Sequence, residues 1–273
     1  MKRRFFIRTI MIGSGSVLIG SQKSEGKISK KAPIKIRMLY NNIGSSSLLS
    51  SKWGLAMLIE RQDETVLFDT GGDAMVLLEN VQKEGIDLSK VSKVVISHNH
   101  WDHVNGLDAF ATKWNDKLEV YVPGDSLGDI RSNFSSYKLI GVNEPIELNE
   151  FAWSTGQLTT DYTSNPIYEQ SLIVTFGDTI YVLTGCSHPG IVKIVDKAKS
   201  IFPDRTISLV AGGFHMIKYA NDDIKEASNG LKKLGVEKIA PSHCTGDTAI
   251  NMFKDQWGEN FVDFNLGQNQ ISL

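Results

Sequence analysis

The sequence has two cysteines, Cys186 and Cys244, and no Cys-x-x-Cys pair. Two cysteines cannot form a disulfide framework, so they are free thiols, neighbours of a metal ion, or one bridge. No run of about 18 apolar residues is present, which excludes an ordinary membrane-spanning helix. Stability must therefore come from a packed hydrophobic core, for which 273 residues suffice.

Basic residues are scarce once the first 31 residues are set apart. Residues 1–31 hold eight of the 29 lysines and arginines but one of the 31 acidic residues, Glu25. The rest of the chain has 21 basic and 30 acidic residues, a net charge of −9. A net negative charge on this part of the chain repels polyphosphate backbones, so we expect a small-molecule substrate and no nucleic acid partner.

The first 31 residues have the layout of an export signal followed by a polar linker. Arg3 and Arg4 precede Phe-Phe-Ile-Arg8, which resembles the twin-arginine pattern, and a short apolar run extends to Gly20. That run is too short to span a bilayer. We expect export to the periplasm, with no stable membrane span unless the signal stays uncleaved. The alternative interpretation is a disordered basic tail.

From Ile34 onward, apolar runs typical of buried strands alternate with amphipathic helical stretches. Strand patterns cover residues 34–42, 55–60, 65–69, 91–97, 118–123, 171–176, 179–184, 206–211 and 238–241. Helical patterns cover residues 73–84, 190–202, 222–234 and 248–257. Apart from 118–123, residues 104–170 are expected to form long loops. This alternation of strand and helix patterns predicts one layered α/β domain over residues 32–273, with β-sheet in the middle.

The histidines all follow apolar strand patterns, and they are His98, His100, His103, His188, His215 and His243. Ligands collect at strand ends in layered α/β folds, so this placement indicates a binding site. The first three form an H-x-H-x-D-H motif with Asp102, and imidazole with carboxylate suits zinc, manganese or ferrous iron. One tetrahedral ion cannot use all four side chains and a water. The spacing therefore predicts two divalent ions, one at His98 and His100 and one at Asp102 and His103.

The motif and its surroundings resemble the metallo-β-lactamase superfamily. Residues 67–72 (LFDTGG) resemble the Asp-x-Gly strand end that precedes the metal loop, and Gly106-Leu107 follows the motif as in the family. Residues 182–188 and 239–243 resemble the two later strand ends. The resemblance runs from about residue 34 to about residue 270 and implies a four-layer αββα sandwich.

Three further segments, residues 184–190, 212–215 and 241–246, are similar to one subgroup of that superfamily. Its members are named as 7,8-dihydropterin-6-methyl-4-(ribofuranosyl)aminobenzene-5′-phosphate synthase-like proteins. This subgroup name implies a phosphate-bearing pterin as one candidate for the substrate chemistry. It does not by itself establish the reaction.

The resemblance also implies metal ligands, with two departures from the usual pattern. No histidine lies between Val104 and Ser187, where most members have a further ligand, so we infer that His188 replaces it. Cys186 stands where many members have a metal-bridging aspartate, and it either binds metal or lines the site as a small buried residue. His243, in the family's last motif, is predicted to be a ligand.

Three side chains are expected to surround these ligands. His215 follows two glycines and is predicted to contact the substrate or donate a proton, with a packed histidine as the alternative. Asp69 is expected either to orient a metal-binding histidine or to cap a turn. Trp101, inside the metal loop, is expected to pack the loop rather than to stack on a substrate.

These features together predict a binuclear metal-dependent hydrolase in which a metal-bound hydroxide attacks a small ester. Asp102 is predicted to be catalytic because it would hold the second ion beside that hydroxide, and a phosphate ester is the favoured substrate. The alternatives are a pterin-phosphate-forming synthase, an iron oxidoreductase and a metal-binding protein without activity. The lack of a Cys-x-x-Cys pair disfavours the oxidoreductase, and the complete motif disfavours a protein without activity.

Overall fold

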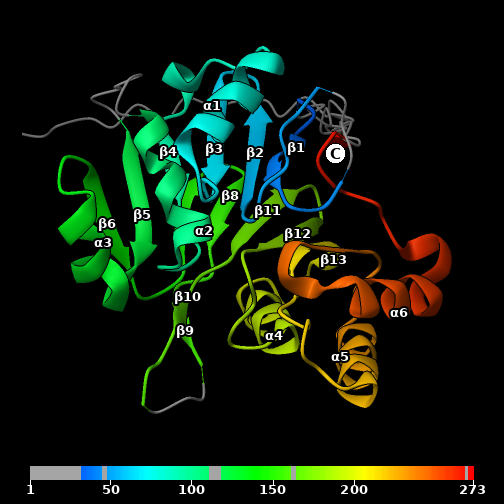
Figure 1. Cartoon of the computed structure of the whole chain (residues 1–273). Helices are drawn as coiled ribbons and strands as arrows, with labels where there is room; N and C mark the ends of the chain where they lie inside the picture. Colours follow the sequence, from blue (N-terminus) through cyan, green and yellow to red (C-terminus); the bar gives the residue numbers. More distant parts are fainter. Residues whose placement is uncertain (1–31, 45–47, 111–117, 161–163, 268–269) are drawn as a thin grey trace, which may run out of the picture. The chain divides into compact units, whose positions relative to one another are not determined.

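A computed structural model describes residues 32–44, 48–110, 118–160, 164–267 and 270–273 of the chain (Figure 1). The chain divides into a unit of residues 1–31 and a compact unit of residues 32–273. The predicted export signal and linker fall on residues 1–31 and so lie outside the described residues. Among the described residues, no helix has the length and apolar character needed to cross a membrane.

Two β-sheets and one short strand pair make up the β structure of the described residues. The first sheet has the order β15-β1-β2-β3-β4-β5-β6 and the second β14-β13-β12-β11-β8-β7. The strands of the first are β1 (Lys35–Asn41), β2 (Leu55–Arg61), β3 (Glu64–Phe68), β4 (Lys93–Val95), β5 (Glu119–Pro123), β6 (Lys138–Val142) and β15 (Ile271–Ser272). The strands of the second are β7 (Ile146–Asn149), β8 (Ala152–Ser154), β11 (Leu172–Phe176), β12 (Thr179–Thr184), β13 (Thr206–Gly213) and β14 (Ile239–Ser242). The short pair is β9 (Leu158–Thr159) with β10 (Tyr168–Glu169).

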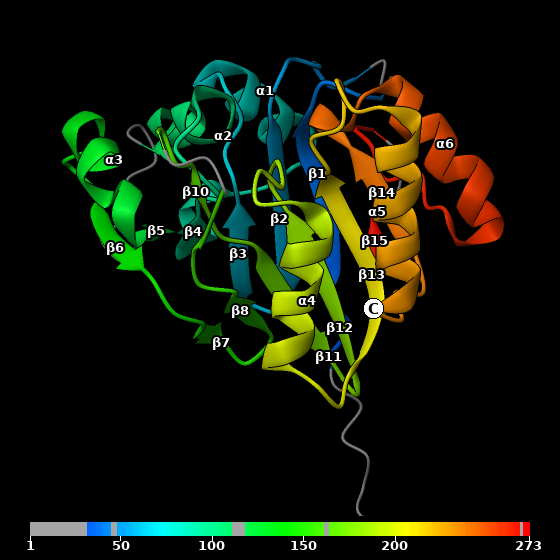
Figure 2. The same cartoon turned by 90° about the horizontal axis from the view of Figure 1, so that it is seen from below.

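Helices cover the outer faces of both sheets (Figures 1 and 2). Those packed against the first sheet are α1 (Ala74–Lys83), α2 (Trp101–Val104) and α3 (Leu127–Asn133). Those packed against the second are α4 (Ile191–Ile201), α5 (Asn221–Lys233) and α6 (Asp247–Trp257). Short 3₁₀ helices span Leu88–Lys90, Asn105–Phe110, Gly124–Ser126, His243–Thr245 and Gly258–Asn260.

Side chains alternate between the two faces of a strand, and this alternation explains why each sheet has a core on both sides. Strand β2 is the simplest example. Leu55, Met57 and Ile59 face the second sheet, where they join the core between the sheets. Ala56 and Leu58 point the other way, into the core under α1. Because successive side chains of a strand face opposite sides, an unbroken apolar run is buried on both faces. The four-layer αββα sandwich predicted from the sequence is confirmed.

Parallel strands in both sheets bring the sequence-predicted site residues to strand ends. β3 and β4 are parallel neighbours, and so are β12, β13 and β14. Asp69 directly follows β3, and His98 comes shortly after β4. Cys186, His215 and His243 follow β12, β13 and β14. The carboxyl ends of parallel strands share one edge of a sheet, which is where ligands bind in such folds.

The expectation of long loops over residues 104–170 is wrong. This stretch contains α3, β6, β7, β8 and the β9–β10 pair. The strands are short, and β6 and β7 lie at sheet edges, where one side of a strand stays open to solvent. In β6, exposed Lys138 and Gly141 interrupt buried Leu139 and Val142, so the apolar pattern is too weak to predict a strand.

Candidate metal centre

The metal loop, residues 98–103, follows β4 and includes the start of α2, and it brings its histidines together. His98 Nε2 lies 3.0 Å from His100 Nδ1. Two nitrogen ligands of one tetrahedral zinc ion, each 2.0–2.1 Å from the metal, lie roughly 3.3 Å apart. The two imidazoles therefore face a common point at the spacing that one ion requires.

His188 and Cys186 lie beside these two histidines, and we call the four candidate metal ligands His98, His100, Cys186 and His188 the first ligand group. The His188 ring centroid lies 4.6 Å from that of His98 and 4.8 Å from that of His100. Donor atoms of His98, Cys186 and His188 all lie within 4.8 Å of one another. The structure thus brings His188 next to His98 and His100, from which it is far apart in the sequence.

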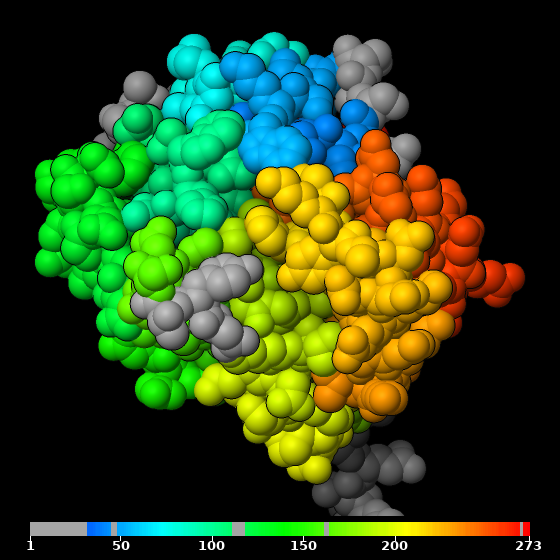
Figure 3. Space-filling view, turned by 60° about the horizontal axis from the view of Figure 1, so that its bottom comes forward, coloured from blue at the N-terminus to red at the C-terminus, as the bar shows by residue number. Residues whose placement is uncertain are grey.

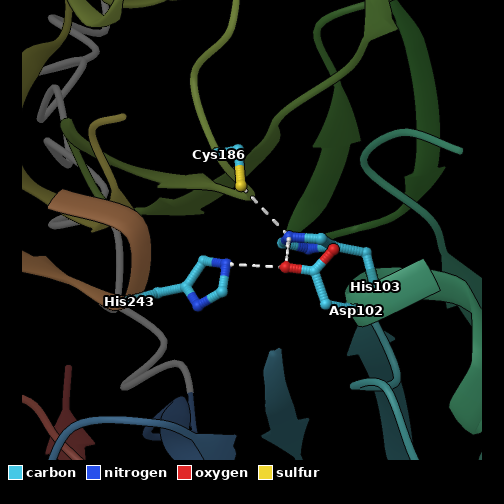
Figure 4. A group of neighbouring side chains, drawn as sticks. All are labelled: Asp102, His103, Cys186 and His243. Carbon is cyan, nitrogen blue, oxygen red and sulfur yellow. Dashed lines mark hydrogen bonds and ion pairs between the residues drawn. The ribbon is translucent and has the colours of Figure 1, made fainter. Parts of the chain in front are cut away.

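The second ligand group consists of Asp102, His103, Cys186 and His243 (Figure 4), whose donor atoms also lie within 4.8 Å of one another. His103 Nε2 is 3.2 Å from Cys186 Sγ and 3.6 Å from Asp102 Oδ2. His243 Nε2 is 3.3 Å from Asp102 Oδ2 and is buried without a hydrogen-bond partner among the described residues. A buried nitrogen without a hydrogen-bond partner, surrounded by a carboxylate, an imidazole and a thiol, is suited to bind a divalent ion. Cys186 belongs to both groups.

Four of the histidines are held through Nδ1 by polar side chains, and this leaves Nε2 turned toward the ligand groups. The pairs are His98 with Ser97 Oγ (2.9 Å), His103 with Asp69 Oδ2 (2.7 Å), His188 with Glu169 Oε2 (2.9 Å) and His243 with Asn42 Oδ1 (2.5 Å). Such outer contacts fix the tautomer and the ring orientation of a ligating histidine.

Asp69 contacts His103 and also anchors the start of the metal loop. Its Oδ1 accepts a hydrogen bond from the Ser97 backbone N–H (2.6 Å), and Oδ2 accepts one from Ser97 Oγ (2.8 Å). Burial raises the pKa of Asp69, against the opposing effect of His103. Burial lowers the pKa of His103, but the Asp69 carboxylate outweighs burial and raises that pKa to about 9. Of the two alternatives predicted for Asp69, the contact with a histidine is present, and its other side-chain bonds go to Ser97 rather than to the turn at Gly71 and Gly72.

His98, His100 and Asp102 favour forms that bind cations. Burial, reinforced by neighbouring histidines, lowers the pKa of His98 and of His100. These rings are therefore neutral, which is the form that binds metal. Burial raises the pKa of Asp102, but the interactions with His243 and His103 outweigh it and hold the pKa below its ordinary value. The Asp102 carboxylate is therefore charged.

Cys186 is held at the meeting point of the two groups by a close approach of the backbone. A Cβ on the preceding residue, Gly185, would lie 2.1 Å from Ser97 Oγ, so only glycine allows β12 to end so near the metal loop. Burial raises the pKa of the Cys186 thiol, and Cys244 raises it further. A coordinating divalent ion reverses this effect and deprotonates a thiol.

Glu169 is a site residue that sequence reasoning missed. The side chain is fully buried. Its Oε1 accepts hydrogen bonds from the backbone N–H groups of Cys186 (2.9 Å) and Ser187 (2.7 Å), and its Oε2 accepts one from that of His188 (2.8 Å). Burial raises the pKa of Glu169, but the interactions with His188 and the backbone hydrogen bonds from Ser187 and His188 together outweigh it and lower the pKa. Glu169 therefore orients the segment that carries two of the first group's ligands.

A Glu169→Gln substitution is expected to weaken metal binding about 10- to 100-fold. An amide nitrogen, which donates hydrogen bonds, would replace a carboxylate oxygen that accepts them from the backbone of residues 186–188. Competition with a zinc-sensitive chelator dye measures the affinity. Glu147→Gln, at an exposed position of β7, is the matched control and should bind as the unaltered protein does. Equal affinity in both variants would show that Glu169 does not position the ligands.

His215 lies beside the two ligand groups and forms a third candidate group with Cys186 and Cys244. Its ring centroid is 4.4 Å from that of His188, and its donor atoms lie within 4.8 Å of those of Cys186 and Cys244. The hydrogen bond with Cys244 raises its pKa above the ordinary value. His215 is exposed to solvent, whereas the candidate ligands are buried or, for His100 and His188, partly buried, so a molecule bound at the centre could reach His215.

Comparison with known proteins agrees with this fold and site. The sequence profile of the metallo-beta-lactamase superfamily matches residues 54–243. This span includes more than half of the chain and runs from the start of β2 to His243. The chain therefore belongs to the metallo-β-lactamase superfamily.

Individual relatives give the same picture. The chain is 28% identical to the 7,8-dihydropterin-6-methyl-4-(beta-D-ribofuranosyl)-aminobenzene-5′-phosphate synthase of Methanocaldococcus jannaschii, over 88% of this chain and 97% of the relative. The crystal structure of a metal-dependent hydrolase of the beta-lactamase superfamily superimposes with a TM-score of 0.73 at 26% identity, covering 88% of this chain and 99% of that one. A diphosphatase of the PhnP family shares the fold, with a TM-score of 0.58 at 17% identity, over 88% and 96% of the two chains.

Proposed function

We propose that this protein is a binuclear metal-dependent hydrolase of small esters, with a phosphate ester as the favoured substrate. The observation that carries the proposal is the pair of ligand groups that share the Cys186 sulfur. His98, His100 and His188 would hold one ion, and Asp102, His103 and His243 the other. The imidazole and thiol donors favour zinc, and Mn²⁺ and Fe²⁺ suit a thiol less well.

Two such ions, when bound, would lower the pKa of a shared water to about 7 and polarise the oxygen of the ester. The side chains around the ions would supply the charge, the substrate contact and the orientation of the ligands. Asp102 contributes a negative charge that offsets a divalent ion. His215, which is exposed and lies beside His188, would contact the substrate or donate a proton to the leaving group. Asp69 and Glu169 keep the ligands oriented.

The surroundings of His100 favour a small substrate with a single anionic group. A pocket of about 210 Å³ lies beside His100, lined among others by Asn99, Asp125, Ser126 and Asp129. The two carboxylates would repel further phosphates of a longer chain. Together with the net charge of −9 outside residues 1–31, this supports the expectation that nucleic acid is not a substrate.

The archaeal relative offers a second candidate function. Its name describes a synthase that forms a phosphate-bearing dihydropterin, and it matches 88% of this chain. A reaction of that kind would use the same ligand groups with a different substrate. Assay of the synthase reaction alongside hydrolysis separates the two candidates.

A panel of esters on zinc-loaded protein tests the proposed hydrolase. It should contain phosphodiesters, phosphomonoesters, lactones and thioesters. We expect turnover of at least one class of phosphate ester, lost when a chelator strips the metal and restored when zinc is returned. Metal-loaded protein that hydrolyses none of these esters would contradict the proposal.

We also propose that residues 1–31 direct export of the folded protein, because Arg3 and Arg4 precede an apolar run. Replacing both arginines by lysine is expected to hold the protein in the cytoplasm, since a twin-arginine route requires the arginine pair. Cell fractionation measures the location, and Lys30→Arg with Lys31→Arg is a control of equal charge. Export of the double-lysine variant at the unaltered level would argue against this route.

A further inference from the structure

Large apolar side chains that remain exposed gather next to the two ligand groups. Trp53 is 42% exposed, Trp101 is 56% exposed and Ile217 is 55% exposed. A soluble protein gains by burying such side chains, and their grouping on a surface marks a binding site. We call these three residues the apolar rim.

Trp53 lies over the second ligand group. Its ring centroid is 5.1 Å from that of His243, with the planes tilted by 52°. The next residue, Gly54, has a φ of +141°, and a Cβ there would come within 2.6 Å of the Asp102 carbonyl oxygen. A close backbone approach that only glycine permits therefore fixes Trp53 beside Asp102 and His243.

Trp101 lies within the metal loop, between His100 and Asp102. Its ring packs on Gly72, where a Cβ would be 2.5 Å from the nearest ring carbon. The packing role expected from the sequence is therefore present, but it leaves more than half of the side chain exposed. Gly72 also adjoins the carbonyl oxygen of Trp53, so the two tryptophans lie on neighbouring parts of the surface.

Ile217, the third residue of the apolar rim, also lies near the second ligand group. It contacts Gly246, three residues after His243, where a Cβ would be 2.9 Å from the Ile217 Cγ1. Figure 3 shows the blue surface around residue 50 adjoining the yellow surface around residue 215. Segments that are far apart in the sequence thus meet beside the ligand groups.

We propose that the apolar rim binds a planar aromatic group of the substrate, so that the preferred ester carries an aryl or heteroaryl group next to its anionic group. The proposal rests on the proposed function, in which the buried ligand groups hold the anionic end. The remainder of the substrate would then pass the exposed side chains on its way to solvent. Indole rings gain from offset or edge contacts with a planar ring beyond simple burial, and an alkyl group does not.

Calorimetric titration of zinc-loaded protein with phenylphosphonate and with methylphosphonate tests this. Neither compound has an ester bond to hydrolyse, so binding is measured apart from turnover. We expect phenylphosphonate to bind on the order of tenfold more tightly. The Trp53→Ala/Trp101→Ala variant should lose this preference, and zinc content measured on the same sample separates loss of the rim from loss of metal. Met75→Ala removes a 72% exposed side chain from α1 and should keep the preference.

Several results would overturn the proposal. These are equal affinity for the two phosphonates, binding of neither, or a preference that survives in the double variant. Self-association of the unaltered protein that the double variant abolishes would show that a second copy covers the rim. If no ester is hydrolysed but the rim-dependent preference is found, the hydrolase proposal fails and the aromatic binding site stands.

Discussion

A Cys186→Ser protein is expected to bind fewer than two zinc ions per chain and to lose on the order of 10²-fold or more in kcat/KM. The reason is that the Cys186 sulfur lies in both ligand groups, so its loss weakens both at once. A serine hydroxyl is a poor ligand for zinc compared with a thiolate. Zinc content by mass spectrometry and turnover are measured on the same preparation.

Cys244→Ser is the matched control for this substitution. Cys244 is equally buried and lies near Cys186; its sulfur is close to the Cys186 sulfur and to a ring nitrogen of His215 but is not part of the first or the second ligand group. We expect the control to keep two zinc ions. A Cys186→Ser protein that also keeps two ions with unchanged affinity would show that Cys186 only lines the site. The ligands would then be the histidines and Asp102 alone.

Asp102→Asn is expected to weaken one of the two ions selectively and to reduce kcat on the order of 10²-fold or more. The amide keeps the shape of the carboxylate but removes the charge that faces His103 and His243. Folding should survive, because the hydrophobic cores and the first ligand group are unchanged. Zinc titration should show one tight site remaining, and circular dichroism should show unaltered secondary structure.

Asp108→Asn provides the comparison, since Asp108 is an exposed carboxylate in the same stretch of chain and has no place in either ligand group. It should keep both ions and full turnover. Near-normal activity of Asp102→Asn with two bound ions would mean that Asp102 is peripheral. The proposed hydrolase mechanism would then have to be abandoned.

The sequence predicted the central strands because their apolar runs are buried on both faces. The run at 55–60 is an example, since alternate residues of β2 enter two different cores. The edge strands β6 and β7 were missed because solvent reaches one side and breaks the pattern. Their existence depends on pairing with distant strands, which a local window of sequence does not contain.

The same distinction holds at the site. The H-x-H-x-D-H motif places three histidines and Asp102 within six residues, so it is visible locally. The inference that His188 joins them came from a family resemblance and a missing histidine, and the structure brings it next to His98 and His100. Glu169 and Asn42 gave no signal, because their contacts with His188 and His243 arise from packing between segments that are distant in the sequence.

Zinc stoichiometry is the most direct test of the central claim that two ligand groups share one thiol. Purified protein is stripped with a chelator, titrated with zinc under competition, and analysed by mass spectrometry under non-denaturing conditions. The account predicts two zinc ions per chain, with His188→Ala weakening one site, His243→Ala weakening the other, and Cys186→Ser weakening both. A single zinc ion per chain, or none, would contradict it.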